Sequence, residues 1–244
     1  MQRKTHKVLG YAVDLMSFKE ALEFVETKIN KDEGLHVVTI NPEIIEFANK
    51  DINFAEILKN ADLTIPDGVG IKIALKLKGI QQEQIPGIEF AKATINICEK
   101  TNKKVALIGA REEVIQKAKN NLKNEHQNLN ICYSRNGYFT KDEEKEIIDQ
   151  LISQEPNLIL VALGAPKQDL FIKMCKEKHP NAIYIGVGGS FDVWAGEVER
   201  APESFRKVGC EWLYRTIKQP ERLKRIYKTL PIFLFKAIIE AVKK

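Results

Sequence analysis

The sequence predicts an α/β fold in which a mostly parallel sheet is covered by helices. Short apolar, β-branched runs alternate along the chain with longer segments whose apolar residues recur at helical spacing. Glycine, proline or asparagine follows most of the apolar runs, as is typical where a strand turns into a helix. Regular alternation of strand and helix indicates right-handed crossover units, which make neighbouring strands parallel.

The expected strands are short and mostly apolar. They cover residues 7–13, 35–40, 61–66, 104–109, 130–134, 157–163 and 182–185. The second of these runs is rich in β-branched residues, which favour strands, and it ends at Asn41-Pro42. The apolar run after Asn157 is typical of a strand that is buried on both faces of a parallel sheet.

The expected helices lie between these strands. They cover residues 17–30, 51–59, 71–77, 88–101, 110–124, 141–153 and 169–178, and a further helix begins at Pro42. Ser17 and Glu20 form a capping-box pattern at the start of the first helix. Pro42 suits a first helical turn, where the backbone N–H groups have no partner within the helix. Residues 51–59 either continue that helix or form a second one.

A chain of 244 residues forms one large domain, or one domain and an appendage. The composition changes near Ala201-Pro202, after which we expect helices and no strands. The sequence therefore predicts a Rossmann-like α/β domain over residues 1–202 and a C-terminal helical appendage over residues 203–244.

The appendage is strongly basic. Residues 206–244 hold 11 Lys and Arg but only 3 acidic residues, a net charge of +8, whereas the whole chain carries +5 and the remainder therefore −3. Aromatic and aliphatic residues alternate with these cations, and Pro220 and Pro231 are expected to divide the tail into short segments. Such a basic, amphipathic tail favours an anionic membrane surface. A terminal helix packed on the core, and a nucleic-acid contact, are the two alternatives.

Several classes of protein are excluded or disfavoured by the sequence. Four separated cysteines and four scattered histidines give no zinc or disulfide pattern, and no run approaches the roughly 20 apolar residues that span a bilayer. The apolar run near the N-terminus is too short for a convincing signal peptide. The motifs of P-loop, nicotinamide-binding and serine-hydrolase proteins are missing. The sequence also lacks an Asp-x-Asp pair, which favours chemistry without a metal or cofactor.

Polar residues follow several of the expected strands. They are Thr39, Asn41, Asp67, Gln168 and Asp192. Because the carboxyl ends of parallel strands meet at one edge of the sheet, we expect these residues to share one cleft. A carboxylate held there can act as a general base toward a hydroxyl group. Alternatively, Asp67 caps the next helix, Asn41 forms a turn before Pro42, and Asp192 occupies a helix N-terminus.

A glycine-rich turn follows the strand at 182–185. Gly186, Gly188 and Gly189 allow the backbone to approach a ligand closely, and Ser190 can cap a following helix. The alternative is a tight strand-to-helix turn that binds nothing.

Together, these segments resemble the WecG/TagA/CpsF family of bacterial glycosyltransferases over nearly the whole chain. The resemblance is carried by Thr39-x-Asn41, Pro66-Asp67-Gly68-x-Gly70, Gly137-Tyr138-Phe139, Ala162-Leu163-Gly164-Ala165-Pro166-Lys167-Gln168, Gly186-Val187-Gly188-Gly189-x-Phe191-Asp192, Gly196, Arg200-Ala201-Pro202 and Glu211-Trp212-Leu213-Tyr214-Arg215. It implies a Rossmann-like domain with a C-terminal helical appendage. The tail is most similar to the TagA branch, which acts in wall teichoic acid synthesis.

The resemblance also implies a reaction. TagA-like enzymes transfer N-acetylmannosamine from its UDP donor to the C4 hydroxyl of N-acetylglucosaminyl-diphospho-undecaprenol, with inversion and without a metal. This implies a protein at the inner face of the cell membrane, and the apolar faces of the appendage also suit a homo-oligomer. The alternatives are transfer of another sugar, such as glucose or N-acetylmannosaminuronic acid, and a non-catalytic membrane scaffold that binds a UDP-sugar.

By the same resemblance, Asp67 matches the proposed base, and Thr39 and Asn41 match residues of its pocket. The candidate substrate-binding residues are Gly109, Tyr138, Gln168, Gly186, Gly188, Gly189, Asp192, Arg215, Arg222 and Arg225. The three arginines match appendage residues that close on the diphosphate. The sequence departs from the family at Gln84, where relatives often have Arg.

Overall fold

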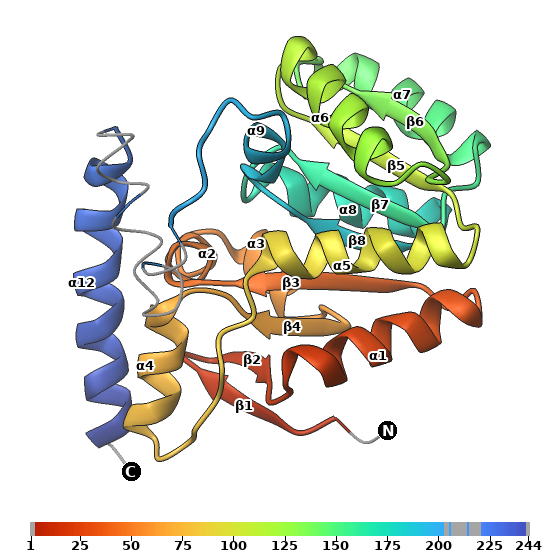
Figure 1. The fold of residues 1–244 in the computed structure, drawn as a ribbon. Coiled ribbons are helices and arrows are strands. Elements are labelled where there is room, and N and C mark those ends of the chain that lie inside the picture. The colour runs from red at the N-terminus through yellow and green to blue at the C-terminus, as the bar shows by residue number, and fades with distance from the viewer. Residues whose placement is uncertain (1–2, 203–204, 206–213, 215–220, 243–244) are drawn as a thin grey trace.

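The structure is a computed structural model that describes residues 3–202, 205, 214 and 221–242, with 221–228 described by their backbone. Six strands form one sheet in the order β4-β3-β8-β7-β5-β6 (Figure 1). They are β3 (Leu35–Ile40), β4 (Leu63–Pro66), β5 (Val105–Gly109), β6 (Ile131–Arg135), β7 (Leu158–Ala162) and β8 (Ile183–Gly186). Every neighbouring pair is parallel, which confirms the predicted fold class.

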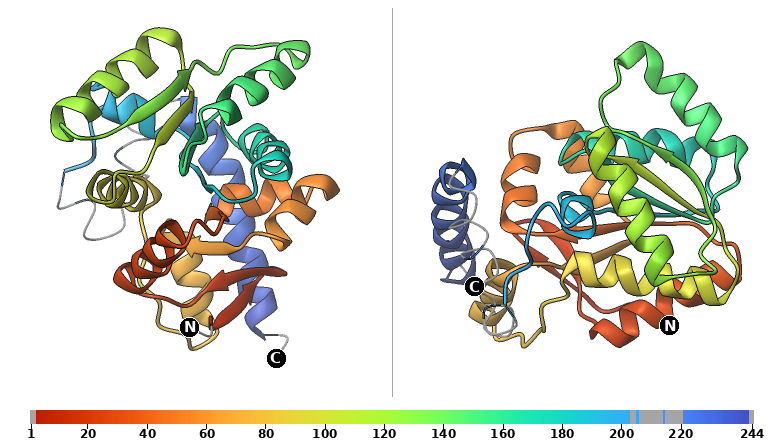
Figure 2. Two further views of the ribbon diagram at one scale, coloured as in Figure 1. Left: turned by 90° about the vertical axis from the view of Figure 1, so that its right-hand side faces the viewer. Right: turned by 45° about the horizontal axis from the view of Figure 1, so that its top comes forward.

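Helices cover both faces of this sheet (Figure 2). One face packs against α1 (Phe18–Asn30), α5 (Gly87–Lys100), α6 (Glu112–Glu125) and α9 (Ser190–Trp194). The other face packs against α2 (Pro42–Ala48), α3 (Ile52–Lys59), α4 (Val69–Leu77), α7 (Lys141–Ser153) and α8 (Lys167–Lys178). Along β7, Leu158 and Leu160 point to the first face and Ile159 and Val161 to the second, so the strand is buried on both sides.

The first strand was predicted as one run over residues 7–13, and this is wrong. The chain instead forms an antiparallel hairpin of β1 (Thr5–Val8) and β2 (Tyr11–Asp14). Leu9 and Gly10, with φ of 48° and 89°, make the two-residue turn. Asp14 accepts a hydrogen bond of 2.7 Å from the backbone N–H of Thr64. The hairpin therefore shields the outer edge of β4, which would otherwise expose unpaired backbone groups.

Local sequence patterns predicted most of the helices correctly. The capping box of Ser17 and Glu20 is present at the start of α1. Residues 51–59 form a second helix, α3, instead of continuing α2. The Asp51 side chain accepts hydrogen bonds from the N–H groups of Asn53 and Phe54 and so caps the start of the new helix. Helix α7 occupies the predicted residues, and α8 begins two residues earlier than expected, at Lys167.

The C-terminal segment was expected to break at Pro231, and this is also wrong. Residues Glu221–Val242 form one helix, α12, with Pro231 inside it. The helix runs beside α4 and contacts α2 (Figures 1 and 2). Phe233 and Ala237 are fully buried in that contact, which holds the helix together across the proline. Among the described residues, none of the helices is both long and apolar enough to cross a bilayer. The division of the chain at residue 202 remains a prediction.

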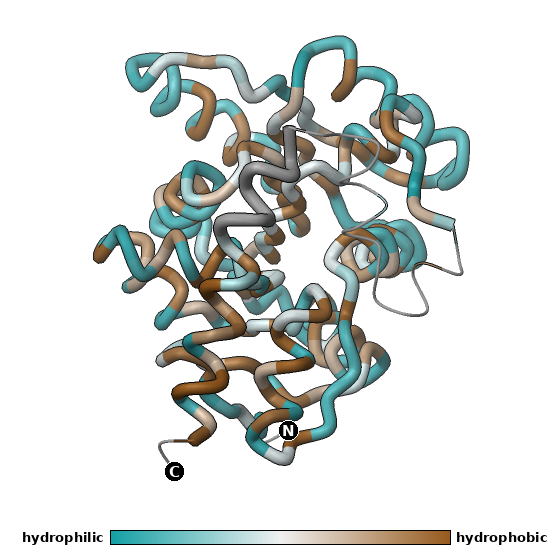
Figure 3. Tube along the Cα trace, turned by 90° about the vertical axis from the view of Figure 1, so that its left-hand side faces the viewer, coloured by the Kyte–Doolittle hydropathy of each residue, from teal (hydrophilic) through white to brown (hydrophobic). Residues whose placement is uncertain are grey.

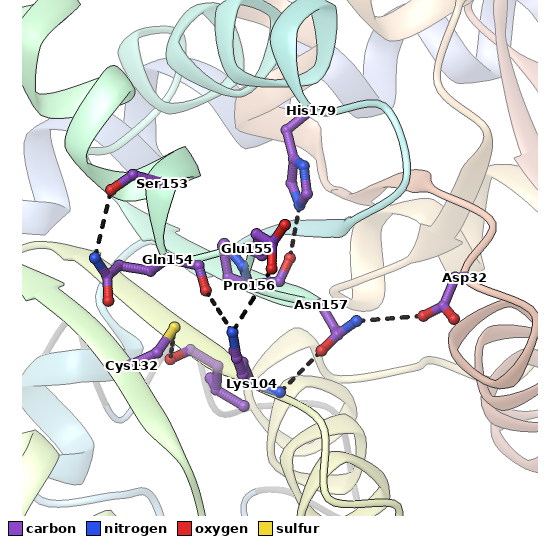
Figure 4. Close-up of polar contacts among 10 residues, drawn as sticks. Asp32, Lys104, Cys132, Ser153, Gln154, Glu155, Pro156, Asn157 and His179 are labelled. Carbon is purple, nitrogen blue, oxygen red and sulfur yellow. Dashed lines mark hydrogen bonds and ion pairs between the residues drawn. The ribbon is translucent and has the colours of Figure 1, made fainter.

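The amino-terminal edge of the sheet has a network of polar groups around a smaller cleft of about 340 Å³ (Figure 4). The backbone N–H of Lys104 donates 3.0 Å to Oδ1 of Asn157, whose Nδ2 in turn donates to Asp32. The ammonium of Lys104 donates 3.0 Å to the carbonyl of Gln154, and Nε2 of His179 lies 2.9 Å from the carbonyl oxygen of Pro156. These groups satisfy one another, and the larger clefts lie at the opposite, carboxyl edge.

Two buried thiols should be inert at neutral pH. Burial raises the pKa of Cys98 and of Cys175 to about 12 in each case, so almost no reactive thiolate forms there. We expect iodoacetamide at pH 7.5 to leave both unmodified in the folded protein and to modify both in denaturant. Peptide mapping by mass spectrometry measures this, and rapid labelling of either thiol in the native state would contradict the burial described here.

Candidate active site

The register of β3 and β4 brings two candidate residues together. Thr39 pairs with Ile65, and Ile40 pairs with Pro66. Asn41 and Asp67 each follow the last paired residue of their strand, and adjacent strands lie about 4.8 Å apart. The two side chains therefore leave the same edge of the sheet as neighbours. The backbone N–H of Asp67 donates 2.8 Å to the carbonyl of Ile40, which fixes the turn.

A glycine lets helix α5 begin directly beside these residues. A Cβ placed on Gly87 would lie 2.8 Å from Cγ2 of Thr39 and 3.3 Å from Oδ2 of Asp67. Only a residue without a side chain fits so close to Thr39. The contact shows that Thr39 and the carboxylate of Asp67 face the same small space, and it makes Gly87 part of the site.

Asn41 has a structural role at this position. Its Oδ1 accepts a hydrogen bond of 3.0 Å from the backbone N–H of Ile44 and so caps α2. The amide Nδ2 is the part of this side chain that can donate to a ligand. Asn41 is therefore the N-cap of α2, instead of forming a separate turn before Pro42, and this role leaves its Nδ2 for a ligand.

These residues line one cavity of about 570 Å³ at the carboxyl ends of β4, β3, β8 and β7. Eight of the candidates lie in its wall: Thr39, Asn41, Asp67, Gln168, Gly186, Gly188, Gly189 and Asp192. The wall also includes residues that sequence reasoning missed: Glu43, Gly87, Thr229 and Leu230. Gln84, the departure from the family pattern, lines the cavity as well. Helix α12 is thus one of its walls.

A second cleft, of about 600 Å³, adjoins the first at Ala162, which lines both. It lies at the carboxyl ends of β5 and β7, where α6 leaves toward one face of the sheet and α8 toward the other. Ligands of open α/β sheets bind at such switch points. Tyr138, which is 74% exposed, lines this cleft and presents an aromatic ring there.

Lys167 supplies positive charge to the second cleft. Its ammonium lies 4.5 Å from the ring centroid of Phe139 and donates 3.4 Å to the carbonyl of Gly137. Sequence reasoning missed this residue, although it stands in the Ala162–Gln168 motif immediately before a residue that was selected. The sequence signal that could have identified Lys167 is its position directly before Gln168, a predicted pocket residue, within that motif.

Gly109 does not line either cavity. It has φ of 128°, and a Cβ there would lie 2.3 Å from the carbonyl oxygen of Ala162. A glycine is required at this position because β5 and β7 approach each other closely there, next to the second cleft.

The three appendage arginines cannot be placed. Arg215 lies outside the described residues, and Arg222 and Arg225 lie in the part of α12 that is described by its backbone. Across the described residues, groups of three or more histidine, cysteine or acidic side chains that could hold a metal ion are not found.

The sequence is similar to those of known proteins over almost its full length. The family model for the glycosyl transferase WecG/TagA/CpsF family matches residues 6–244. An N-acetylglucosaminyldiphosphoundecaprenol N-acetyl-beta-D-mannosaminyltransferase of Bacillus spizizenii is 34% identical over 93% of this chain and 87% of its own length. Proteins with the same name from Bacillus subtilis (33% identical, 93% and 88%) and Staphylococcus aureus (32% identical, 97% and 93%) are similar. The chain therefore belongs to the WecG/TagA/CpsF family of glycosyl transferases.

Proposed function

We propose that this protein transfers N-acetylmannosamine from UDP-N-acetylmannosamine to the C4 hydroxyl of N-acetylglucosaminyl-diphospho-undecaprenol, a step of wall teichoic acid synthesis. The observation that carries this proposal is the carboxylate of Asp67 beside Thr39, in a cavity at the carboxyl edge of the sheet. The relatives that are named for this activity match the chain over almost its full length, which supports the choice of sugar and acceptor.

Asp67 is the general base of this reaction. Its carboxylate takes the proton of the C4 hydroxyl while that oxygen attacks the anomeric carbon of the donor. The bond from this carbon to the diphosphate oxygen breaks on the opposite side, UDP leaves with the bonding electrons, and the anomeric configuration inverts. The hydroxyl of Thr39 and the amide of Asn41 hold the acceptor sugar in the orientation that this attack requires.

The donor lies across both clefts. Its nucleotide occupies the second cleft, where the ring of Tyr138 can stack on the base and Lys167 can contact the diphosphate. Its sugar passes Ala162 into the first cavity, toward Asp192 and the glycine turn. Negative charge builds on the departing UDP, and preorganised cations are what stabilise it. Lys167 and the arginines Arg215, Arg222 and Arg225 are assigned to this task.

The purified protein should be assayed with UDP-N-acetylmannosamine and a lipid-diphosphate N-acetylglucosamine acceptor. We expect one UDP released for each disaccharide lipid formed, as measured by chromatography and mass spectrometry. Absence of UDP release, with both substrates verified, would contradict the proposal. A panel with UDP-glucose and UDP-N-acetylmannosaminuronic acid identifies another sugar if one is used. UDP binding without turnover on any acceptor would favour a non-catalytic scaffold.

The acceptor is carried by a membrane lipid, and we place the protein at the inner face of the cell membrane. Support comes from the charge of +8 over residues 206–244 and from the outer side of α12. Figure 3 shows hydrophobic residues along that helix. Among the residues of α12 whose side chains are described, 229–242, the exposed large hydrophobic ones are Ile232, Phe235, Ile238, Ile239 and Val242. Apolar side chains beside basic residues suit the headgroup region of an anionic bilayer.

Replacing both Phe235 and Val242 by serine should weaken this attachment. Their side chains are 65% and 79% exposed, so the fold should be unaffected. A large apolar side chain contributes about 1.5–3 kcal/mol when it is buried, so we expect the affinity for phosphatidylglycerol-containing vesicles to fall at least tenfold. Vesicle flotation measures this. The matched control is Ile52→Ser, which changes a 77% exposed residue on α3, and equal binding of both variants would contradict the role of α12.

A further inference from the structure

The first turn of α8 stands between the two clefts. Lys167 lines the second cleft, and the next residue, Gln168, lines the first. Gln168 is nevertheless only 4% exposed, so most of its side chain contacts protein. A buried amide of this kind has partners that fix its position, and these partners show what the residue does.

The partners of Gln168 are in the glycine turn after β8. Its Oε1 accepts a hydrogen bond of 3.3 Å from the backbone N–H of Gly188. Its Nε2 lies 2.5 Å from the point where a Cβ on Gly186 would be, so the amide occupies the space that a side chain there would need. Gly188 has φ of 48°, in the left-handed region, and a Cβ on it would have no neighbour within 4 Å. The amide of Gln168 thus contacts the turn at two of its glycines, and both the amide and the turn line the cavity.

Gln168 is itself fixed in the first turn of α8. Its backbone N–H donates 2.9 Å to the carbonyl of Gly164. The next residue, Asp169, is 2% exposed, and its Oδ1 lies 3.5 Å from Nε2 of the buried His36 on β3. The turn has other bonds as well: the Val187 N–H donates 2.8 Å to the carbonyl of Val161, and the Ser190 N–H donates 3.1 Å to the carbonyl of Val187. Gln168 adds the bond at Gly188, a residue whose backbone is conformationally free in the absence of a partner.

We propose that Gln168 is a positioning residue, which holds the 186–189 turn in the shape that receives the donor sugar, and that it acts through the Gly188 N–H rather than as a substrate ligand. The kinetic test of this inference depends on the proposed function, because it measures turnover of the proposed donor. Its structural readout, the stability of the turn, is independent of that function.

Two substitutions distinguish the role of the acceptor oxygen Oε1 from that of the rest of the Gln168 side chain. Gln168→Met keeps the length but leaves the Gly188 N–H without an acceptor, whereas Gln168→Glu keeps an acceptor oxygen at that place. We expect the Met variant to lose about 10- to 100-fold in kcat/KM, with a raised KM for the donor and an unchanged KM for the lipid acceptor. The Glu variant should stay within a few-fold of the wild-type protein. Lys173→Met, at an exposed position of the same helix, is the control.

A substitution on the other side of the contact provides an independent test. In Gly186→Ala the new methyl group displaces the amide of Gln168. We expect this variant to resemble Gln168→Met, and the double variant to be no worse than either single one, because both break the same contact. Hydrogen exchange should be faster in the peptide that contains residues 186–189 in each of these variants, and it should stay slow in Gln168→Glu and Lys173→Met.

Two outcomes would overturn the inference. If hydrogen exchange of the turn is unchanged in Gln168→Met, then the residue does not support the turn. If Met and Glu variants lose activity equally while the turn stays protected in the Glu variant, then Gln168 binds substrate directly. Faster exchange in both Gln168→Met and Gly186→Ala, with no turnover by the wild-type protein on the proposed substrates, would retain the positioning role and reject the proposed function instead.

Discussion

Replacing Asp67 by Asn is expected to reduce turnover about 10²- to 10⁴-fold, the usual contribution of a general base. Asn has the same shape, and the backbone N–H of residue 67 still donates to the carbonyl of Ile40, so the turn after β4 should persist. The amide cannot accept the proton of the acceptor hydroxyl at neutral pH. UDP release at saturating donor and acceptor measures the loss in kcat.

The control for this prediction is Asp149→Asn. Asp149 lies exposed on α7 and pairs with Lys178, so its substitution also removes one carboxylate from a surface ion pair. We expect wild-type turnover from it, since an exposed pair contributes little. Both variants should melt near the wild-type temperature and bind UDP equally. Turnover within about threefold of wild type in Asp67→Asn would remove Asp67 as the base and with it the proposed mechanism.

Replacing Phe233 by Ala should destabilise the protein by about 3–5 kcal/mol, as is usual when a buried phenylalanine is truncated. The Phe233 ring is fully buried in the cluster that joins α12 to α2 and α4. Two ion pairs support this contact, Lys236 with Glu46 and Glu240 with Lys78, each at 2.7 Å. The melting temperature should fall by roughly 6–20 °C, if the whole chain unfolds in one transition.

Phe235→Ala is the matched control, because Phe235 lies on the same helix and is 65% exposed. Its effect on stability should be within about 0.5 kcal/mol. Since Thr229 and Leu230 of α12 line the cavity, Phe233→Ala should also lower turnover, even below its melting temperature. If α12 detaches locally, limited proteolysis will cut within residues 221–242 before the sheet unfolds. Equal stability of the two alanine variants would contradict the buried position of this helix.

Much of the fold was predictable because its signals are local. The alternation of apolar runs with amphipathic segments determines which residues form strands and helices, and parallel strands then bring their carboxyl ends to one edge. For this reason the sequence alone predicts Thr39, Asn41 and Asp67 as cleft residues. The capping pairs at Ser17 and Thr140 are equally local, since each joins residues three positions apart.

Other features depend on contacts between residues that are distant in the chain, and these were missed or wrong. Gly87 belongs to the site only because α5 begins against Thr39 and Asp67. Gln168 lines the cavity, as expected of a candidate ligand, but its hydrogen bond with Gly188, twenty residues away, could not be read from the sequence.

The amino-acid pattern alone was sufficient for the order of strands and helices, the parallel sheet, the basic tail and the acid at a strand end, because each follows from neighbouring residues. Only the tertiary structure decided that residues 5–14 form a hairpin, that α12 continues through Pro231, and that this helix forms a wall of the cavity. In α12 the burial of Phe233 and Ala237 against α2 and α4 outweighs the local preference of proline to end a helix. Packing free energy of this kind depends on partners nearly 200 positions away, and the sequence around Pro231 does not indicate them.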